Sequence, residues 1–196
     1  MRWRMLHVVS KRRLSRDDWV NAALDAIADG GLAAVAVEPL AARLGVTKGS
    51  FYAHFASRDA LVEAALVAWE HTHGAEGMSG FAGIEDPAER LEAAMRTAVE
   101  FSQSGAPSVH LSLLGEMHDA RVRDAVGRVT AGRLARLTET YRALGFPPAR
   151  AAHRARLAYA TYVGLLQMAR EAPERRLSPR QISALMAELR STLLAP

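Results

Sequence analysis

The chain has 196 residues, of which 49% are hydrophobic and 23% are charged, with a formal net charge of +4 and no cysteine. The absence of cysteine excludes disulfides, thiol nucleophiles and cysteine zinc sites, and it fits a reducing compartment. No apolar stretch approaches the roughly 18 to 20 residues that a membrane-spanning helix needs, so we expect a cytoplasmic protein. The length suffices for one compact unit or two small ones.

Positive charge is concentrated toward the N-terminal end. Residues 1–58 contain nine Lys or Arg against five Asp or Glu, whereas the remaining 138 residues contain 16 of each kind. This distribution is typical of a segment that neutralises DNA phosphates. A basic run such as the one that contains Arg12 and Arg13 is, by itself, more often a solvated tail. Beside the motif described below, we interpret it as an arm that reaches the DNA backbone or minor groove.

The first expected helix begins near Ser15 and stops at two glycines, Gly30 and Gly31. Ser15 and Asp18 have the spacing of a capping box, and paired glycines are a common helix end. The inward face of this helix carries apolar residues at helical spacing: Val20, Leu24 and Ile27.

Two shorter helices joined by a glycine turn are predicted next. The run LAARLGV, residues 40–46, has its two leucines and first alanine on one apolar stripe, which needs a partner to bury it. Gly45 permits the tight turn, and Thr47 can accept hydrogen bonds from the free N–H groups of the next helix as its N-cap. A unit of this kind has the geometry that places its second helix in the major groove of DNA.

The second short helix, within TKGSFYAHF at residues 47–55, separates apolar from polar side chains. Phe51 and Phe55 are four residues apart, so both rings face inward and clamp this helix onto the preceding one. Gly49 is a poor helix former, but its missing side chain lets the backbone come close to DNA. The outward residues can bond to phosphates or base edges: Lys48, Ser50, Tyr52 and His54.

A fourth helix is expected from Ser57 to about His73, and a glycine-rich segment follows it. The sequence GAEGMSGFAGIEDP has glycine at positions 74, 77, 80 and 83. We interpret this segment as a flexible joint. It divides the chain into a DNA-binding domain over residues 12–73 and a second domain over residues 84–196.

The second domain is predicted to be helical throughout, which makes the protein all-α. No alternating strand pattern is present. Helices are expected to begin at Asp86–Pro87, at about Ser108 and at Ser178–Pro179, and to span Arg121–Leu144 and Pro148–Ala172. The two C-terminal helices carry faces that serve either a dimer or the protomer's own core. The helix that begins at Ser178 has an apolar stripe of Ile182, Leu185, Met186, Leu189 and Leu193. The helix Pro148–Ala172 has a face with small residues, made of Ala151, Ala155, Ala158, Tyr159, Tyr162 and Leu166.

The run GLAAVAVEPLAARLGVTKGSFYAHFASRDAL, residues 31–61, resembles the DNA-binding domain of the TetR family of transcriptional regulators. The resemblance implies an N-terminal three-helix helix-turn-helix domain and a C-terminal helical domain for ligand binding and dimerisation. It departs at Ala36 and Val37, where many relatives place Ser or Thr, because Val37 can neither cap a helix nor donate to a phosphate.

This resemblance assigns roles to the N-terminal residues. Tyr52 and His54 are expected to bind phosphates, and Lys48 and Ser50 are expected to read base edges. Arg58 is expected to anchor the DNA backbone. The complete set of predicted DNA contacts is Thr47, Lys48, Gly49, Ser50, Tyr52, His54, Arg58, Arg12 and Arg13.

The resemblance also implies a function for the whole chain. It predicts a repressor that is released from a palindromic operator by a small-molecule effector, and a homodimer formed by the two C-terminal helices. Repressor and activator dock alike, so the sequence leaves that choice open. We expect no cofactor and no metal. The candidate ligand-binding residues are Trp69, Met95, Phe101, His110, Met117, Tyr159, Tyr162 and Met168, although aromatic residues and methionines at helical spacing are more often core.

Enzyme functions find little support in the sequence. The pairs His71 with His73 and Glu116 with His118 are two residues apart, and such side chains diverge on a helix. Nucleophile-elbow, phosphate-loop and zinc-protease motifs are absent from the sequence. One other alternative remains, a helical dimer that binds a hydrophobic ligand and has lost DNA binding. The Val37 departure favours it slightly, and the concentrated charge argues against it.

Overall fold

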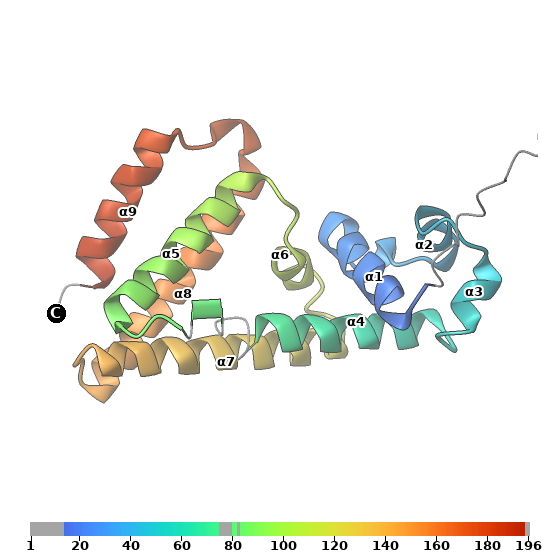
Figure 1. Ribbon diagram of the computed structural model, residues 1–196, viewed down its shortest axis with the longest axis horizontal. Coiled ribbons are helices and arrows are strands. Elements are labelled where there is room, and N and C mark those ends of the chain that lie inside the picture. The colour runs from blue at the N-terminus through green and yellow to red at the C-terminus, as the bar shows by residue number, and fades with distance from the viewer. Residues whose placement is uncertain (1–13, 75–79, 82, 195–196) are drawn as a thin grey trace, which may run out of the picture.

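The computed structural model describes residues 14–74, 80–81 and 83–194, which form α-helices and short 3-10 turns without any strand (Figure 1). The predicted all-α class is therefore confirmed. Arg12 and Arg13 lie outside the described residues. None of the helices in the described ranges is long and apolar enough to cross a bilayer.

The N-terminal part consists of four helices and one 3-10 turn: α1 (Arg16–Gly30), η1 (Leu32–Ala34), α2 (Val37–Arg43), α3 (Lys48–Tyr52) and α4 (Arg58–His73). The predicted capping box of α1 is present, because the Ser15 and Asp18 side chains bond reciprocally to each other's backbone N–H. Gly45 forms the turn between α2 and α3 with a φ of +67°. The start of α2 has no side-chain cap, since Ala36 stands at its N-cap.

The C-terminal part contains the remaining helices: α5 (Pro87–Ser104), α6 (Val109–Leu114), α7 (Ala120–Ala143), α8 (Pro148–Glu171), η3 (Pro173–Arg175) and α9 (Pro179–Leu193). The predicted caps hold, because Asp86, Ser108 and Ser178 each accept a hydrogen bond from the first turn of their helix. The helix predicted from Arg121 begins one residue earlier, at Ala120, and is capped by Asp119.

One hydrophobic core is shared by helices that precede and follow the glycine-rich segment. Trp19, Ile27 and Trp69 from α1 and α4 share this core with Leu113 of α6 and Val122 of α7. Figure 1 shows α6 beside α1, and α4 alongside α7. We call α1–α4 the head and α5–α9 the body. The head therefore packs directly on the body through this shared core, in addition to the chain connection through the glycine-rich segment.

A second core lies among α5, α7, α8 and α9, and it uses residues that we had considered for a dimer. Met186, Leu189 and Leu193 of α9 are buried within the protomer, as are Ala151 and Ala155 of α8. These predicted stripes therefore face the protomer's own core, because α9 packs on α5 and α8. Other parts of α8 remain open to solvent, with Leu157 56% exposed and Met168 65% exposed.

Candidate DNA-binding face and ligand cavity

The short helix α3 is held in place by an aromatic cluster beneath it. Phe51 is fully buried, and its ring packs edge-on against Trp19 of α1 with the centroids 5.3 Å apart. Phe55 follows α3 and stacks on Phe51 at 5.8 Å. The guanidinium of Arg16 covers Phe55, 4.7 Å from the ring centroid. The clamp predicted from the two phenylalanines therefore joins α3 to α1 as well as to α2.

The opposite surface of α3 is open to solvent. Tyr52 is 57% exposed. Thr47 stands at the N-cap position, but its side chain does not make the capping bond that we expected, so the helix does not use its hydroxyl. Each of the six predicted contacts of this segment is exposed or partly exposed, and we call them the recognition surface: Thr47, Lys48, Gly49, Ser50, Tyr52 and His54.

Lys48 is paired within the protein. Its Nζ lies 2.8 Å from Oε1 of Glu38 on α2, and both side chains are mainly exposed. This hydrogen bond is the chief reason why the pKa of Glu38 is lowered and the pKa of Lys48 is raised. An exposed ion pair contributes little to stability. Lys48 can therefore exchange the carboxylate for a group on DNA at small cost to the fold.

Gly49 is a glycine that the protein's own packing does not require. A Cβ built at this position would meet only Oγ1 of Thr47, at an ordinary contact distance of 3.7 Å. Because α3 is helical here, alanine would also favour the helix more than glycine does. The packing of the described residues therefore does not explain this glycine, and the close approach of its backbone to DNA stays a prediction.

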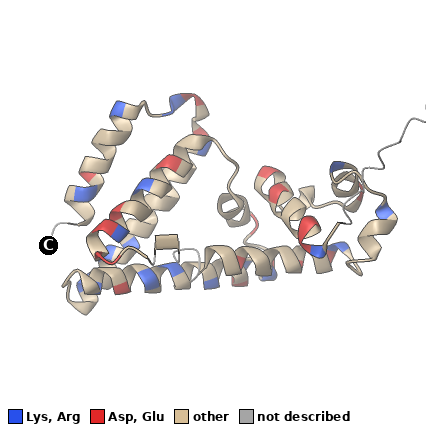
Figure 2. Cartoon of the chain, in the orientation of Figure 1, with Lys and Arg blue, Asp and Glu red and all other residues tan. Residues whose placement is uncertain are grey.

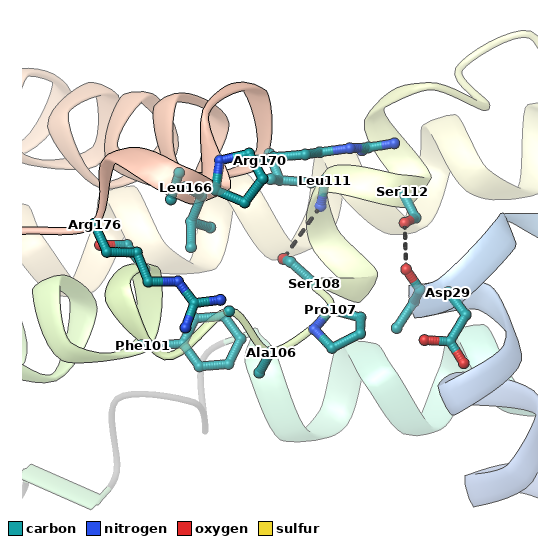
Figure 3. A pocket seen from close by; sticks show the side chains of 15 residues that line it. Asp29, Phe101, Ala106, Pro107, Ser108, Leu111, Ser112, Leu166, Arg170 and Arg176 are labelled. Atoms are coloured by element: carbon teal, nitrogen blue, oxygen red, sulfur yellow. Dashed lines mark hydrogen bonds between the residues drawn. The ribbon is translucent and has the colours of Figure 1, made fainter.

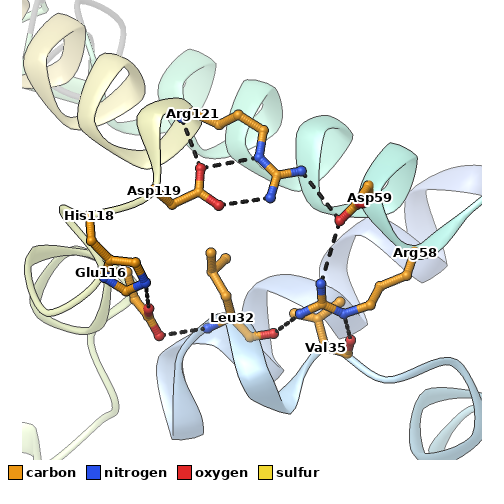
Figure 4. A network of polar contacts seen from close by, with 8 residues as sticks. All are labelled: Leu32, Val35, Arg58, Asp59, Glu116, His118, Asp119 and Arg121. Atoms are coloured by element: carbon orange, nitrogen blue, oxygen red, sulfur yellow. Dashed lines mark hydrogen bonds and ion pairs between the residues drawn. The ribbon is translucent and has the colours of Figure 1, made fainter.

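Arg58 is directed into the protein and not along the recognition surface (Figure 4). Its Nε donates to the carbonyl oxygen of Val35 at 2.6 Å, and its Nη2 donates to that of Leu32. Its Nη1 also lies 3.5 Å from the Asp59 carboxylate. In this arrangement the guanidinium fixes the start of α4 against η1. Its predicted contact with the DNA backbone stays a prediction.

The positive charge of residues 1–58 is distributed unevenly between the first 13 residues and the rest. Residues 14–58 contain four basic and five acidic residues, whereas residues 1–13 contain five basic residues and no acid. Figure 2 shows basic and acidic residues mixed over the helices. Arg43, for example, pairs with Asp25 at 2.7 Å. The whole positive excess of the N-terminal segment therefore lies in its first 13 residues, which are outside the described ranges.

A cavity of about 300 Å³ lies where α1, α6 and α8 meet the end of α5 (Figure 3). Phe101 and Leu166 line it together with Arg176, whose Nη1 donates to the carbonyl oxygen of Ser104 at 3.4 Å. The Arg176 guanidinium also covers Gly105, which has a φ of +73° and no space for a side chain. Of the eight predicted ligand residues, this cavity contains Phe101 alone among the described residues.

A second cavity, of about 290 Å³, lies among α5, α7, α8 and the last residue of α4, and we call it the ligand cavity. It brings together four of the predicted ligand residues, namely Met95 and Phe101 of α5 with Tyr159 and Tyr162 of α8. The other residues that line it are His73, Phe81, Leu91, Ala94, Thr97, Ala98, Arg133, Leu137 and Ala158. The lining is therefore mostly apolar, as ligand pockets usually are.

Two further predicted residues form a layer behind the ligand cavity. His110 of α6 is 3% exposed, and its Nε2 lies 3.3 Å from the Tyr159 hydroxyl. Trp69 of α4 is 1% exposed and stacks on His110 with ring centroids 5.9 Å apart. Burial lowers the pKa of His110 to about 4, and the nearby Arg133 adds to the effect, so this histidine is neutral at pH 7.

The helix-turn-helix residues match a known family. Residues 20–65 match the family model described as bacterial regulatory proteins, tetR family. Residues 20–65 therefore form a DNA-binding domain of the TetR type. This match covers α1 from Val20 onward, η1, α2, α3 and the first half of α4, and so includes the recognition surface. No curated protein matches the chain in sequence.

Several solved structures share the fold over nearly the whole chain. A TetR-family regulator from Agrobacterium tumefaciens has a TM-score of 0.73 and 20% identity over 92% of this chain and 97% of its own. The regulator FadR from Bacillus subtilis, solved with stearoyl-CoA, has a TM-score of 0.67 and 14% identity over 92% and 98%. AibR, solved with isovaleryl coenzyme A and operator DNA, has a TM-score of 0.64 and 19% identity over 92% and 98%.

Two predicted ligand residues lie away from both cavities. Met117 is 37% exposed in the turn after α6, and Met168 is 65% exposed on α8, so neither lines a cavity. Sequence reasoning missed Arg133. The signal was present, because Val129 and Leu137 are each four residues from Arg133 and both are buried, which places a charged residue on an inward stripe of α7.

Proposed function

We propose that this protein is a repressor that binds a palindromic operator as a homodimer and releases it when a small molecule occupies the ligand cavity. The observation that carries the proposal is the recognition surface, which lies on a helix anchored by Phe51 within the segment that matches the TetR family. Lys48 and Ser50 read base edges, while Tyr52 and His54 hold phosphates. Such a protein acts where the DNA is, in the cytoplasm.

The dimer is proposed to form through α8 and α9. Met186, Leu189 and Leu193 of α9 are buried within the protomer, whereas Leu157 and Met168 of α8 are exposed and can contact a partner. Large apolar side chains that are exposed on one helix are typical of a protein interface. Two-fold symmetry then presents two recognition surfaces to the two halves of a palindrome.

The effector is proposed to bind in the ligand cavity. This cavity touches the end of α4, whose other end begins at Arg58, near the recognition surface. Two of the structural neighbours were solved with coenzyme A thioesters, and one of these was also solved with operator DNA. A ligand that favours one position of α4 would change the affinity for DNA by the same factor as DNA changes the affinity for the ligand.

Selection of bound sequences from random duplex DNA tests the proposal. The full chain, incubated with the pool at modest salt, is expected to enrich a palindromic motif with two half-sites. A variant in which Lys48→Ala and Tyr52→Ala are combined serves as the control and is expected to enrich nothing. If the unmodified chain also enriches no motif, the protein is not a sequence-specific regulator, and a helical dimer that binds a hydrophobic ligand without DNA becomes the better description.

A further inference from the structure

The ligand cavity has one charged residue among the described residues that line it, namely Arg133 of α7. None of the described residues that line the cavity is acidic. The Nη1 atom of Arg133 is buried and has no hydrogen-bond partner within the described ranges. A buried guanidinium nitrogen without an acceptor is unfavourable, and buried cations in proteins are normally paired with an anion. The cavity therefore offers a binding position for a negative group.

The groups around Arg133 orient it and do not neutralise it. Its Nε donates to the carbonyl oxygen of His73 at 2.9 Å, and its guanidinium carbon lies 5.3 Å from the centroid of the Tyr162 ring. Burial and the charge of Arg133 both lower the pKa of His73 and of His110, so both histidines are neutral at pH 7. Among the described lining residues, the polar end of the cavity then carries a single positive charge.

Hydroxyl groups complete this polar end. The Tyr159 hydroxyl lies 3.1 Å from Oγ1 of Thr130 and 3.3 Å from Nε2 of His110, so it is held in a fixed position at the cavity wall. The rest of the lining is mostly apolar and includes Leu91, Met95 and Leu137. The cavity thus has a cationic, hydrogen-bonding end and a hydrophobic body.

We propose that the ligand cavity binds a small amphipathic carboxylate, with its carboxylate on Arg133 and its hydrocarbon part against the apolar lining. A guanidinium pairs with a carboxylate through two parallel hydrogen bonds, which suits a planar anion. A volume of about 290 Å³ admits a short acyl chain or a single aromatic acid. This inference rests on the proposed function only in naming the effector, since binding of the acid is measured without DNA.

The position of Arg133 also links this ligand to the head. The carbonyl of His73 that accepts from Arg133 belongs to the last residue of α4. A ligand carboxylate that binds the Arg133 guanidinium competes with the His73 carbonyl for its N–H groups. Binding of the ligand therefore changes the hydrogen bond that holds the C-terminal end of α4. Arg128 makes the neighbouring connection from α7 to α4, with its Nε 2.6 Å from Oε1 of Glu70. Arg128 does not line the cavity, so it provides a matched control.

The test compares three ligands of equal length by calorimetry on the full chain: octanoate, 1-octanol and octylammonium. Octanoate is expected to bind at least about tenfold more tightly than 1-octanol, the effect of one charge-assisted hydrogen bond, and octylammonium is expected not to bind. The Arg133→Gln variant is expected to remove the preference for octanoate and to keep the binding of 1-octanol. Arg133→Lys is expected to retain part of the preference, and Arg128→Gln is expected to retain all of it.

The same measurements can overturn the proposal. Retained binding of 1-octanol shows that the cavity of Arg133→Gln is folded, so an unchanged preference for octanoate in that variant excludes Arg133 as the anchor. Binding of octanoyl-coenzyme A without any binding of octanoate also overturns it, since the site would then recognise the thioester and its nucleotide. DNA selection by the unmodified chain is scored separately, so failure of the ligand inference and failure of the proposed function are distinguishable.

Discussion

The carboxylate of Glu116, in the turn after α6, accepts a hydrogen bond from the backbone N–H of Leu32 at 3.2 Å (Figure 4). It also occupies the space next to Gly31, which has a φ of +69° and where a Cβ would lie 2.5 Å from Glu116 Oε1. The Leu32 carbonyl in turn accepts from Arg58. Glu116 therefore ties the C-terminal part of the chain to η1 in the head.

This relationship predicts a non-additive pair of substitutions. Glu116→Ala leaves the Leu32 N–H without its acceptor and is expected to lower the free energy of unfolding by about 1–2 kcal/mol. Gly31→Ala adds backbone strain and a collision with the carboxylate, and is expected to cost about 2–3 kcal/mol. In the double variant the collision is gone, so its cost should be smaller than the sum. Urea unfolding measures all three, and simple additivity would show that the two residues are not coupled.

Substitutions on the recognition surface should affect DNA binding and leave stability unchanged. Lys48→Ala and Tyr52→Ala are each expected to weaken operator affinity at least about tenfold, and the double variant should show no specific binding. Arg43→Ala removes a cation of the head that pairs with Asp25, and it is the matched control. Affinity is measured by fluorescence anisotropy and folding by circular dichroism. Equal losses in the control and in the Lys48 variant would mean that only net charge matters.

The substitution Gly49→Ala is expected to have opposite effects on DNA affinity and on the stability of the fold. Because a Cβ at this position has space, the substitution is expected to raise the free energy of unfolding slightly, by about 0.5 kcal/mol, through helix propensity. It is also expected to weaken operator binding, since the methyl group would separate the backbone from DNA. Gly127→Ala, in α7 with nothing within 4 Å, is the control that should gain stability without losing affinity. Undiminished DNA affinity in the Gly49 variant would place DNA away from the start of α3.

The N-terminal basic run is expected to act through phosphates. Residues 1–13 hold all of the positive excess of the N-terminal segment, so Arg12→Ala combined with Arg13→Ala should weaken binding to operator and to random duplex alike. If each arginine neutralises one phosphate, the slope of log affinity against log salt should become shallower by about 1.8. An unchanged slope, measured by titration at several salt concentrations, would indicate that both arginines remain in solvent.

The buried His110 predicts a dependence of stability on pH. Its pKa is lowered from 6.5 to about 4, so the unfolded chain binds more protons between these values. The stabilising contribution is therefore complete above about pH 6.5 and is lost as the pH falls toward 4. Between pH 7.5 and pH 5, the free energy of unfolding is expected to fall by about 2 kcal/mol more in the unmodified chain than in His110→Gln. The exposed His153→Gln is the control, and equal falls in all three proteins would place the His110 pKa near 6.5.

Local features of the fold could be predicted because they depend on neighbours in the chain. The caps at Ser15, Ser57 and Ser178 follow from side chains that bond to N–H groups up to three residues away. The turn at Gly45 and the inward direction of Phe51 have the same local origin. For this reason the helices, the all-α class and the recognition surface were all predictable from the sequence.

Features that join distant segments were not predictable from periodicity. An apolar stripe indicates that one face of a helix is buried, but it does not indicate which surface covers that face. In the structure, Met186 and Leu189 of the α9 stripe belong to the protomer's own core. The same ambiguity hid Arg133, whose importance depends on a cavity formed by three other helices. The direction of Arg58 toward Leu32 and Val35 also depends on the tertiary fold.

The sequence by itself determined the helices, their ends and which side chains of α3 are exposed to solvent, because the causes of these features lie within a few residues. Only the tertiary structure decided that the head shares a core with α6 and α7, that Glu116 holds Leu32, and that one arginine meets an apolar cavity. These relationships join residues that are 84 positions apart in the case of Glu116 and Leu32. Such contacts arise from the packing of whole helices, which no short stretch of sequence specifies.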